Sequence, residues 1–189
     1  MEALKQKILS DGRVLPGNIL KVDSFLNHQM DPVLIAGIGR QFANLFADQS
    51  ISKIMTVEAS GIAPAILTGL ALGVPVLFAK KTASANMDEE TYAATVHSYT
   101  RGKDYTVRVS RRYLHAEDRI LIIDDFLANG QAVLGLCDLI SQAGATLAGA
   151  GIVIEKQFQD GGRILRQKGI RVEALAIIKE MSNGQITFA

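Results

Sequence analysis

Two adjacent carboxylates, Asp124 and Asp125, stand between a hydrophobic run and a loop of small residues. The run Ile120 to Ile123 is aliphatic throughout, which is typical of a strand covered on both faces. After the loop Ala128 to Ala132, apolar residues return at helical spacing, at Val133, Leu134, Leu136, Leu139 and Ile140. The pattern predicts a strand, a loop and a helix, with both carboxylates at the carboxyl end of the strand.

This loop has the features of an anion site. Its backbone N–H groups would stand at a helix N-terminus, where negative charge is favoured. The two carboxylates beside it offer acceptor oxygens that suit hydroxyl groups. A ligand that carries both a phosphate and hydroxyls would therefore fit. The alternative is an ordinary strand–helix connection with an N-capping or ion-paired acid pair, because a lone glycine-containing loop is weakly specific.

Composition narrows the class of protein. The chain has 189 residues, of which 48% are hydrophobic and 21% charged, so we expect one domain with a substantial core. A net charge of +1 gives no general attraction to nucleic acid or membrane, so we expect a small-molecule partner. The N-terminus lacks the hydrophobic segment of a signal peptide, and no apolar run reaches the roughly 20 residues of a membrane span. We therefore expect a cytoplasmic protein.

Strand and helix patterns alternate along the chain. Asp31 is a predicted N-cap, followed by Pro32 at the first helical position of a helix of about four turns. Repeated alternation predicts an α/β fold with a doubly wound parallel sheet. In such sheets ligands bind at the carboxyl ends of the strands. The further predicted strands span 53–57, 75–79, 149–155 and 170–178, the further helices 62–72, 131–143 and 161–168, and the candidate loops 58–61, 124–131 and 155–158.

A long polar segment, Lys81 to Ser110, separates the two alternating units. Such a segment in a compact domain is often a lid or a binding loop. The short alternating stretch Tyr105 to Val109 is equally compatible with a β-hairpin arm, and a mobile hairpin would satisfy both interpretations. We expect a flexible loop or hairpin over residues 81–113.

The remaining candidate residues give weak signals. The histidines His28, His97 and His115 show no metal-ligand spacing, so we expect no metal held by the protein itself. The single cysteine, Cys137, lies among apolar residues of a predicted helix and is expected to be a buried structural thiol.

Residues 120–132 resemble the ribose-phosphate motif of the type I phosphoribosyltransferases, enzymes that use 5-phosphoribosyl 1-pyrophosphate (PRPP). The usual family loop is close to Thr-Thr-Gly-Gly-Thr, whereas this chain has Ala128-Asn129-Gly130-Gln131-Ala132. This departure removes hydroxyl donors, which backbone N–H groups and the amides of Asn129 or Gln131 could replace. Glu58 to Gly61 is similar to the family's pyrophosphate loop. The polar segment is placed like the family's flexible hood.

The resemblance implies the chemistry of the site. A purine nitrogen would displace pyrophosphate from C1 of PRPP, with Asp124 and Asp125 accepting hydrogen bonds from the ribose hydroxyls. PRPP would also contact residues of the two loops and a basic residue, namely Ala128, Asn129, Gly130, Gln131, Ala132, Ala59, Ser60, Gly61 and Lys81. Lys80 and Arg40 are weaker candidates for the basic residue. Magnesium would arrive with PRPP and not in a protein cage.

The same resemblance places the base. Lys156 follows the predicted strand 149–155, where related purine enzymes use a lysine to bond the exocyclic purine oxygen. A lysine donor favours 6-oxopurines over adenine. The N-terminal residues 1–30 would contribute to a base-binding hood, with Leu20 and Asn27 at the purine. Phe126 or Phe158 could stack on the ring, although each alone also suits a hydrophobic core.

The segment Leu15 to Gln29 extends the resemblance to the members of the purine subfamily that act on xanthine. We therefore expect transfer to N9 of xanthine, with xanthosine 5'-monophosphate and pyrophosphate as products. Two alternatives remain: a PRPP-binding regulator similar to purine repressors, and a guanine or hypoxanthine phosphoribosyltransferase. The resemblance also implies a homodimer, with no nucleic-acid or membrane partner.

Overall fold

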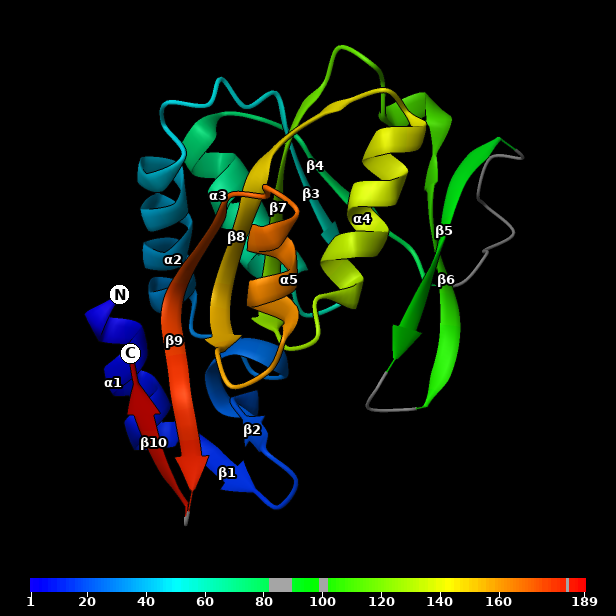
Figure 1. Cartoon of the computed structure of the whole chain (residues 1–189). Helices are drawn as coiled ribbons and strands as arrows, with labels where there is room; N and C mark the ends of the chain where they lie inside the picture. The colour runs from blue at the N-terminus through cyan, green and yellow to red at the C-terminus, as the bar shows by residue number, and fades with distance from the viewer. Residues whose placement is uncertain (82–89, 99–101, 183) are drawn as a thin grey trace.

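The computed structural model describes residues 1–81, 90–98, 102–182 and 184–189. Its centre is a six-stranded sheet in the order β10-β9-β8-β7-β3-β4, with helices on both faces (Figure 1). The strands are β3 (Lys53–Val57), β4 (Val76–Ala79), β7 (Arg119–Leu127), β8 (Thr146–Lys156), β9 (Val172–Ser182) and β10 (Gln185–Phe188). Within the described residues, no helix is both long and apolar enough to span a bilayer.

Five strands of the sheet run parallel, as the alternating pattern predicts. The edge strand β10 is antiparallel, which the sequence reading did not include. Gln185 pairs with Ser182, so the connection from β9 is a tight hairpin. A connection this short can join only antiparallel strands.

The central strand β7 is buried on both faces. Leu121 and Ile123 pack in the hydrophobic cluster beneath α2, whereas Ile120 and Ile122 pack in the cluster beneath α4. All four side chains are fully buried, which explains why the strand is aliphatic at every position. The helices are α1 (Glu2–Asp11), α2 (Pro32–Leu45), α3 (Ile62–Leu72), α4 (Gln131–Gln142) and α5 (Gly161–Gln167).

The predicted elements are confirmed to within a few residues at their ends. Asp31 caps α2, because its Oδ1 accepts hydrogen bonds from the backbone N–H groups of Val33 (3.1 Å) and Leu34 (3.0 Å). One boundary was wrong: Asp124 and Asp125 belong to strand β7 and not to the following loop. The ladder to β8 continues past them, with Asp124 opposite Ile152.

The polar segment contains an antiparallel hairpin of β5 (Thr91–Ser98) and β6 (Lys103–Ser110), which confirms the hairpin interpretation. The hairpin lies against α4 (Figure 1). A Cβ atom on Gly135 of α4 would stand 2.4 Å from the Val96 side chain, so a glycine permits this close packing. The rest of the expected flexible segment includes 82–89 and 99–101, which lie outside the described residues. Its action as a lid stays a prediction.

The N-terminal residues form a second hairpin, β1 (Arg13–Leu15) with β2 (Ile19–Lys21), followed by a helical turn over Asp23–Asn27. These elements were not predicted, because three-residue strands are too short for a periodic pattern. They bring Asn27 to the carboxyl end of β7, where its side chain bonds Asp125.

Candidate active site

The two carboxylates lie at the carboxyl end of β7, between loops that follow the neighbouring strands. Asp124 is 4% exposed and Asp125 is partly buried. The Asp125 backbone N–H donates to Asp124 Oδ1 (3.0 Å), and Asn27 Nδ2 donates to Asp125 Oδ2 (3.0 Å). Burial raises the pKa of both carboxyls, and the neighbouring charge of Asp125 raises the pKa of Asp124 further. The fold therefore places two carboxyls where burial makes their ionised form costly.

The loop after β7 begins helix α4 and shares a cavity with Asp124. Gly130 is the N-cap in the left-handed region (φ 77°), which favours glycine. The cavity of about 170 Å³ is lined by the whole loop 128–132, Asp124 and Phe126, and by Tyr105 and other residues of the β5–β6 hairpin. All five predicted phosphate-binding residues thus line one hollow beside a carboxylate.

The first residue of helix α5 is hydrogen-bonded to the loop 128–132. The Gly161 N–H donates to the Ala128 carbonyl (2.9 Å), and a Cβ on Gly161 would stand 2.4 Å from that oxygen. Next to it, a Cβ on Gly162 would stand 1.9 Å from Glu155 Oε1. Glu155 is 2% exposed and forms a two-point ion pair with Arg166, both distances being 2.7 Å.

The pair between Glu155 and Arg166 was missed by the sequence reading. Its members stand eleven positions apart on different elements, a spacing that no local pattern identifies. The two glycines at the start of α5 were the available signal.

The second loop, after β3, packs directly on the carboxylate site. A Cβ on Gly61 would stand 2.2 Å from Thr56 Oγ1 and 3.1 Å from Asp124 Oδ1. The Thr56 hydroxyl and the Asp124 carboxylate therefore leave room only for glycine at position 61. The peptide bond between Glu58 and Ala59 is cis. Glu58 Oε1 accepts a hydrogen bond from the Lys81 backbone N–H (2.6 Å), which ties the loop to the end of β4.

The candidate basic residues separate in space. The Lys81 ammonium lies 5.4 Å from the centre of the Tyr105 ring, and its charge opposes the rise in the pKa of Asp124. Lys80 lines a different cavity along β4. Arg40 is exposed on α2, and within the described part of the chain no hydrogen bond or ion pair links it to this site. The geometry therefore favours Lys81.

Of the three candidate base-binding residues, Lys156 ends strand β8, Asn27 bonds Asp125 of β7, and Leu20 lies on the N-terminal hairpin. Lys156 Nζ donates to the Asn18 carbonyl (2.9 Å) and lies 5.5 Å from the Phe126 ring centre. Burial lowers the pKa of Lys156. Leu20, on the same hairpin as Asn18, is 6% exposed. Phe126 is thus the aromatic residue beside Lys156, whereas Phe158 is exposed.

No group of three or more His, Cys, Asp or Glu side chains suited to a metal ion occurs among the described residues. The donors that could meet a hard cation are the carboxylates Asp124 and Asp125. Their oxygens suit Mg²⁺, although two carboxylates alone do not enclose it. This donor set fits an ion that keeps most of its ligands from a phosphorylated substrate.

Comparison with known proteins gives consistent results. Residues 27–164 match the model of the phosphoribosyl transferase domain. A xanthine phosphoribosyltransferase of Ruminiclostridium cellulolyticum is 57% identical over 188 residues, covering 100% of this chain and 99% of that one. A protein of the same name from Bacillus cytotoxicus is 54% identical, covering 100% of this chain and 95% of the relative.

Among solved structures, the fold is similar to the APRTase of Giardia lamblia complexed with 9-deazaadenine. The TM-score is 0.76 at 19% identity, with 94% of this chain and 98% of that one covered. The adenine phosphoribosyl transferase of Trypanosoma brucei also gives 0.76, at 16% identity, covering 92% and 78%. At these identities the likeness establishes the architecture alone.

Proposed function

Because this chain belongs to the phosphoribosyl transferase domain family, we propose that it is a purine salvage enzyme acting on xanthine. It transfers the 5-phosphoribosyl group of PRPP to N9 of xanthine and gives xanthosine 5'-monophosphate and pyrophosphate. The relatives with this name match it over its full length at 54–57% identity. No observation on the described residues favours a regulator or a guanine or hypoxanthine enzyme.

The observation that supports this proposal most strongly is the convergence of both loops on Asp124. The loop 128–132 shares a cavity with Asp124, and Gly61 of the second loop approaches Asp124 so closely that an added Cβ would stand 3.1 Å from its Oδ1. PRPP carries a phosphate on one side of its ribose and a pyrophosphate on the other. A sugar held at Asp124 would have an anion site on each side.

In the proposed reaction, the bond from xanthine N9 to C1 of the ribose forms as the bond from C1 to the pyrophosphate oxygen breaks. Positive charge develops on the ribose ring during this exchange. Asp124 and Asp125 accept hydrogen bonds from the ribose hydroxyls and hold C1 in line for attack. Their negative charge also stabilises the developing cation, and the dry surroundings of Asp124 strengthen this effect.

The two loops would bind the anionic ends of PRPP. Backbone N–H groups of residues 128–132, with the amides of Asn129 and Gln131, serve the 5'-phosphate at the start of α4. Ala59, Ser60 and Gly61 serve the pyrophosphate, with Lys81 supplying positive charge. Asp124 and Asp125 would contribute oxygen ligands to a Mg²⁺ ion brought in with PRPP, and the ion would supply positive charge to the leaving pyrophosphate.

Lys156 would select the base. Its ammonium has three donors, so one can stay on the Asn18 carbonyl while another meets the exocyclic oxygen of xanthine. An adenine amino group at that position would repel it. Phe126 would stack on the ring beside Lys156, Leu20 would pack against it, and Asn27 would bond the ring edge while holding Asp125.

We also propose a cytoplasmic homodimer without a nucleic-acid or membrane partner. Two apolar side chains of α3 support a subunit interface, because Ile66 is 49% exposed and Leu70, one turn later, is 76% exposed. Light scattering coupled to gel filtration should give twice the chain mass of 20.4 kDa.

The proposed function is tested by incubating the protein with Mg²⁺, PRPP and each of xanthine, guanine, hypoxanthine and adenine. We expect nucleotide formation with the highest kcat/KM for xanthine and the lowest for adenine. PRPP binding without turnover of any purine would instead support a regulator. Preference for guanine or hypoxanthine would reassign the substrate within the same family.

A further inference from the structure

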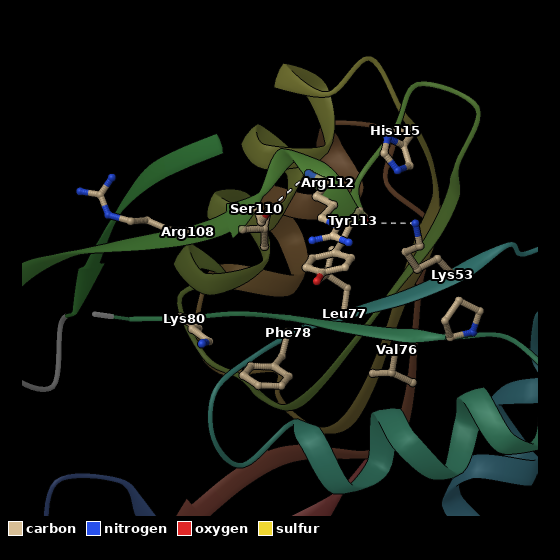
Figure 2. Close-up of a pocket in the computed structure, with 12 residues that line it drawn as sticks. Lys53, Val76, Leu77, Phe78, Lys80, Arg108, Ser110, Arg112, Tyr113 and His115 are labelled. Atoms are coloured by element: carbon tan, nitrogen blue, oxygen red, sulfur yellow. Dashed lines mark hydrogen bonds between the residues drawn. The ribbon is translucent and has the colours of Figure 1, made fainter. Parts of the chain in front are cut away.

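A second and larger cavity lies along the edge strand β4, outside the site described above. Its volume is about 580 Å³, and it lies between β4, the end of β6 and the helical turn Arg111–Tyr113. Figure 2 shows Leu77, Arg112 and Tyr113 on one side of this strand and Lys80 and Phe78 on the other, whereas the Arg108 guanidinium points away from them. It shares no lining residue with the cavity beside Asp124. The volume lies within the range of about 300–1,000 Å³ that is usual for small-molecule sites.

The lining of this cavity is strongly cationic. Its described residues include Lys53, Lys80, Arg108 and Arg112, and none of the lining residues is acidic. Lys53 is neutralised by Asp118, at 2.5 Å. In the part of the chain that the structure describes, the other three form no ion pair with a carboxylate. Of these, Lys80 and Arg112 lie along β4, and two uncompensated positive charges beside one cavity call for a ligand with several negative charges.

The same cavity has an apolar and aromatic side. Val76, Leu77 and Phe78 line it from β4, and Tyr113 lines it from the helical turn. Phe78 is 38% exposed, so its ring keeps surface available for a ligand, whereas the Arg112 guanidinium lies 5.8 Å from the centre of the Tyr113 ring. Flat aromatic rings stack well on a heterocyclic base.

From this combination we infer that the β4 cavity binds a nucleoside polyphosphate, with the phosphates at Lys80 and Arg112 and the base against Phe78. Inorganic phosphate alone would leave the aromatic side unused. An apolar ligand would leave the charges of Lys80 and Arg112 unpaired. This inference concerns a ligand site separate from the proposed transfer reaction.

The test is calorimetric titration of the full-length protein with ATP. We expect saturable binding that Arg112→Gln weakens at least about tenfold, because one charge-assisted contact to phosphate is lost. The matched control is Arg111→Gln, since Arg111 belongs to the same helical turn but stacks on Tyr92 and does not line the cavity. This control should change the affinity less than about twofold.

Two further arms separate the sites and the ligand classes. Gln131→Glu places a negative charge in the loop at the start of α4, so it should weaken binding only if ATP occupies the site beside Asp124. Phe78→Ala should weaken ATP but leave inorganic tripolyphosphate unchanged. The inference would be overturned if ATP does not bind, or if Arg112→Gln and Arg111→Gln lose equal affinity for ATP. It would also be overturned if only Gln131→Glu loses affinity. Equal affinities for ATP and tripolyphosphate would overturn the assignment to a nucleotide.

Discussion

Replacing Asp124 with asparagine should stabilise the protein while removing most of its activity. Burial and the charge of Asp125 raise the pKa of Asp124 in the folded state above the unfolded value. The folded protein therefore binds this proton more tightly than the unfolded chain. The stabilisation by the protonated carboxyl is present below the unfolded pKa and is lost as the pH rises through the folded pKa. Above the unfolded pKa, this side chain therefore lowers the stability of the fold.

Asparagine keeps the shape of the side chain and an oxygen that can accept from the Asp125 N–H. Unlike aspartate, it cannot ionise at this position, which is 4% exposed. Substitutions that relieve such functional-site conflicts commonly give about 0.5–2 kcal/mol. A gain of about 1 kcal/mol raises Tm by roughly 2–4 °C in a chain of this length. Loss of a charged hydrogen bond to the ribose, about 1.5–3 kcal/mol, should lower kcat/KM by about 10- to 150-fold.

The assay combines thermal unfolding, followed by circular dichroism between pH 4 and pH 8, with kcat/KM for PRPP at neutral pH. The stability gain of Asp124→Asn should be largest at the high end of this range and shrink as the pH falls. Asp138→Asn is the matched control, because Asp138 is exposed on α4 and should change neither quantity. A lower Tm at neutral pH, or a gain that grows on acidification, would refute the reasoning.

Three further predictions address other parts of the molecule. Lys156→Gln should raise KM for xanthine about tenfold or more with little change in Tm, whereas Lys168→Gln, on the exposed end of α5, should leave steady-state kinetics unchanged. Arg166→Ala leaves the buried carboxylate of Glu155 without its partner and should lower the free energy of unfolding in urea by about 2–4 kcal/mol. This loss is smaller than for a fully buried pair because the Arg166 side chain is 44% exposed. An unchanged urea midpoint would contradict this prediction. Burial raises the pKa of the Cys137 thiol to about 11, so iodoacetamide at pH 8 should modify it rapidly only after unfolding. Fast labelling of the native protein would contradict this prediction.

Long periodic segments allowed most of the sheet and its helices to be predicted. The aliphatic run of β7 has alternate residues packed on opposite faces, and the N-cap at Asp31 sets the start of α2 as its residue type predicts. The predicted end of β7 was wrong because two carboxylates look like the start of a loop. The ladder to β8, which extends the strand to Leu127, is a tertiary interaction that local sequence does not specify.

In the site, too, local sequence predicts some features, whereas others depend on tertiary packing. The loop 128–132 and Asp124 could be predicted together because they are adjacent in sequence, and a single strand–helix connection places both. Other features of the site join segments that are distant in sequence. They are the close approach of Gly61 to Asp124 and the hydrogen bonds from Asn27 to Asp125 and from Lys156 to Asn18. These contacts depend on how elements pack, so only a resemblance to a family or the structure itself could indicate them.

The most direct test of the proposed transfer reaction is the release of pyrophosphate from PRPP with and without xanthine, measured together with nucleotide formation. The account predicts negligible release without a purine, and one pyrophosphate released for each xanthosine 5'-monophosphate formed when xanthine and Mg²⁺ are present. Release of pyrophosphate that does not depend on a purine, or no release with xanthine, would contradict it.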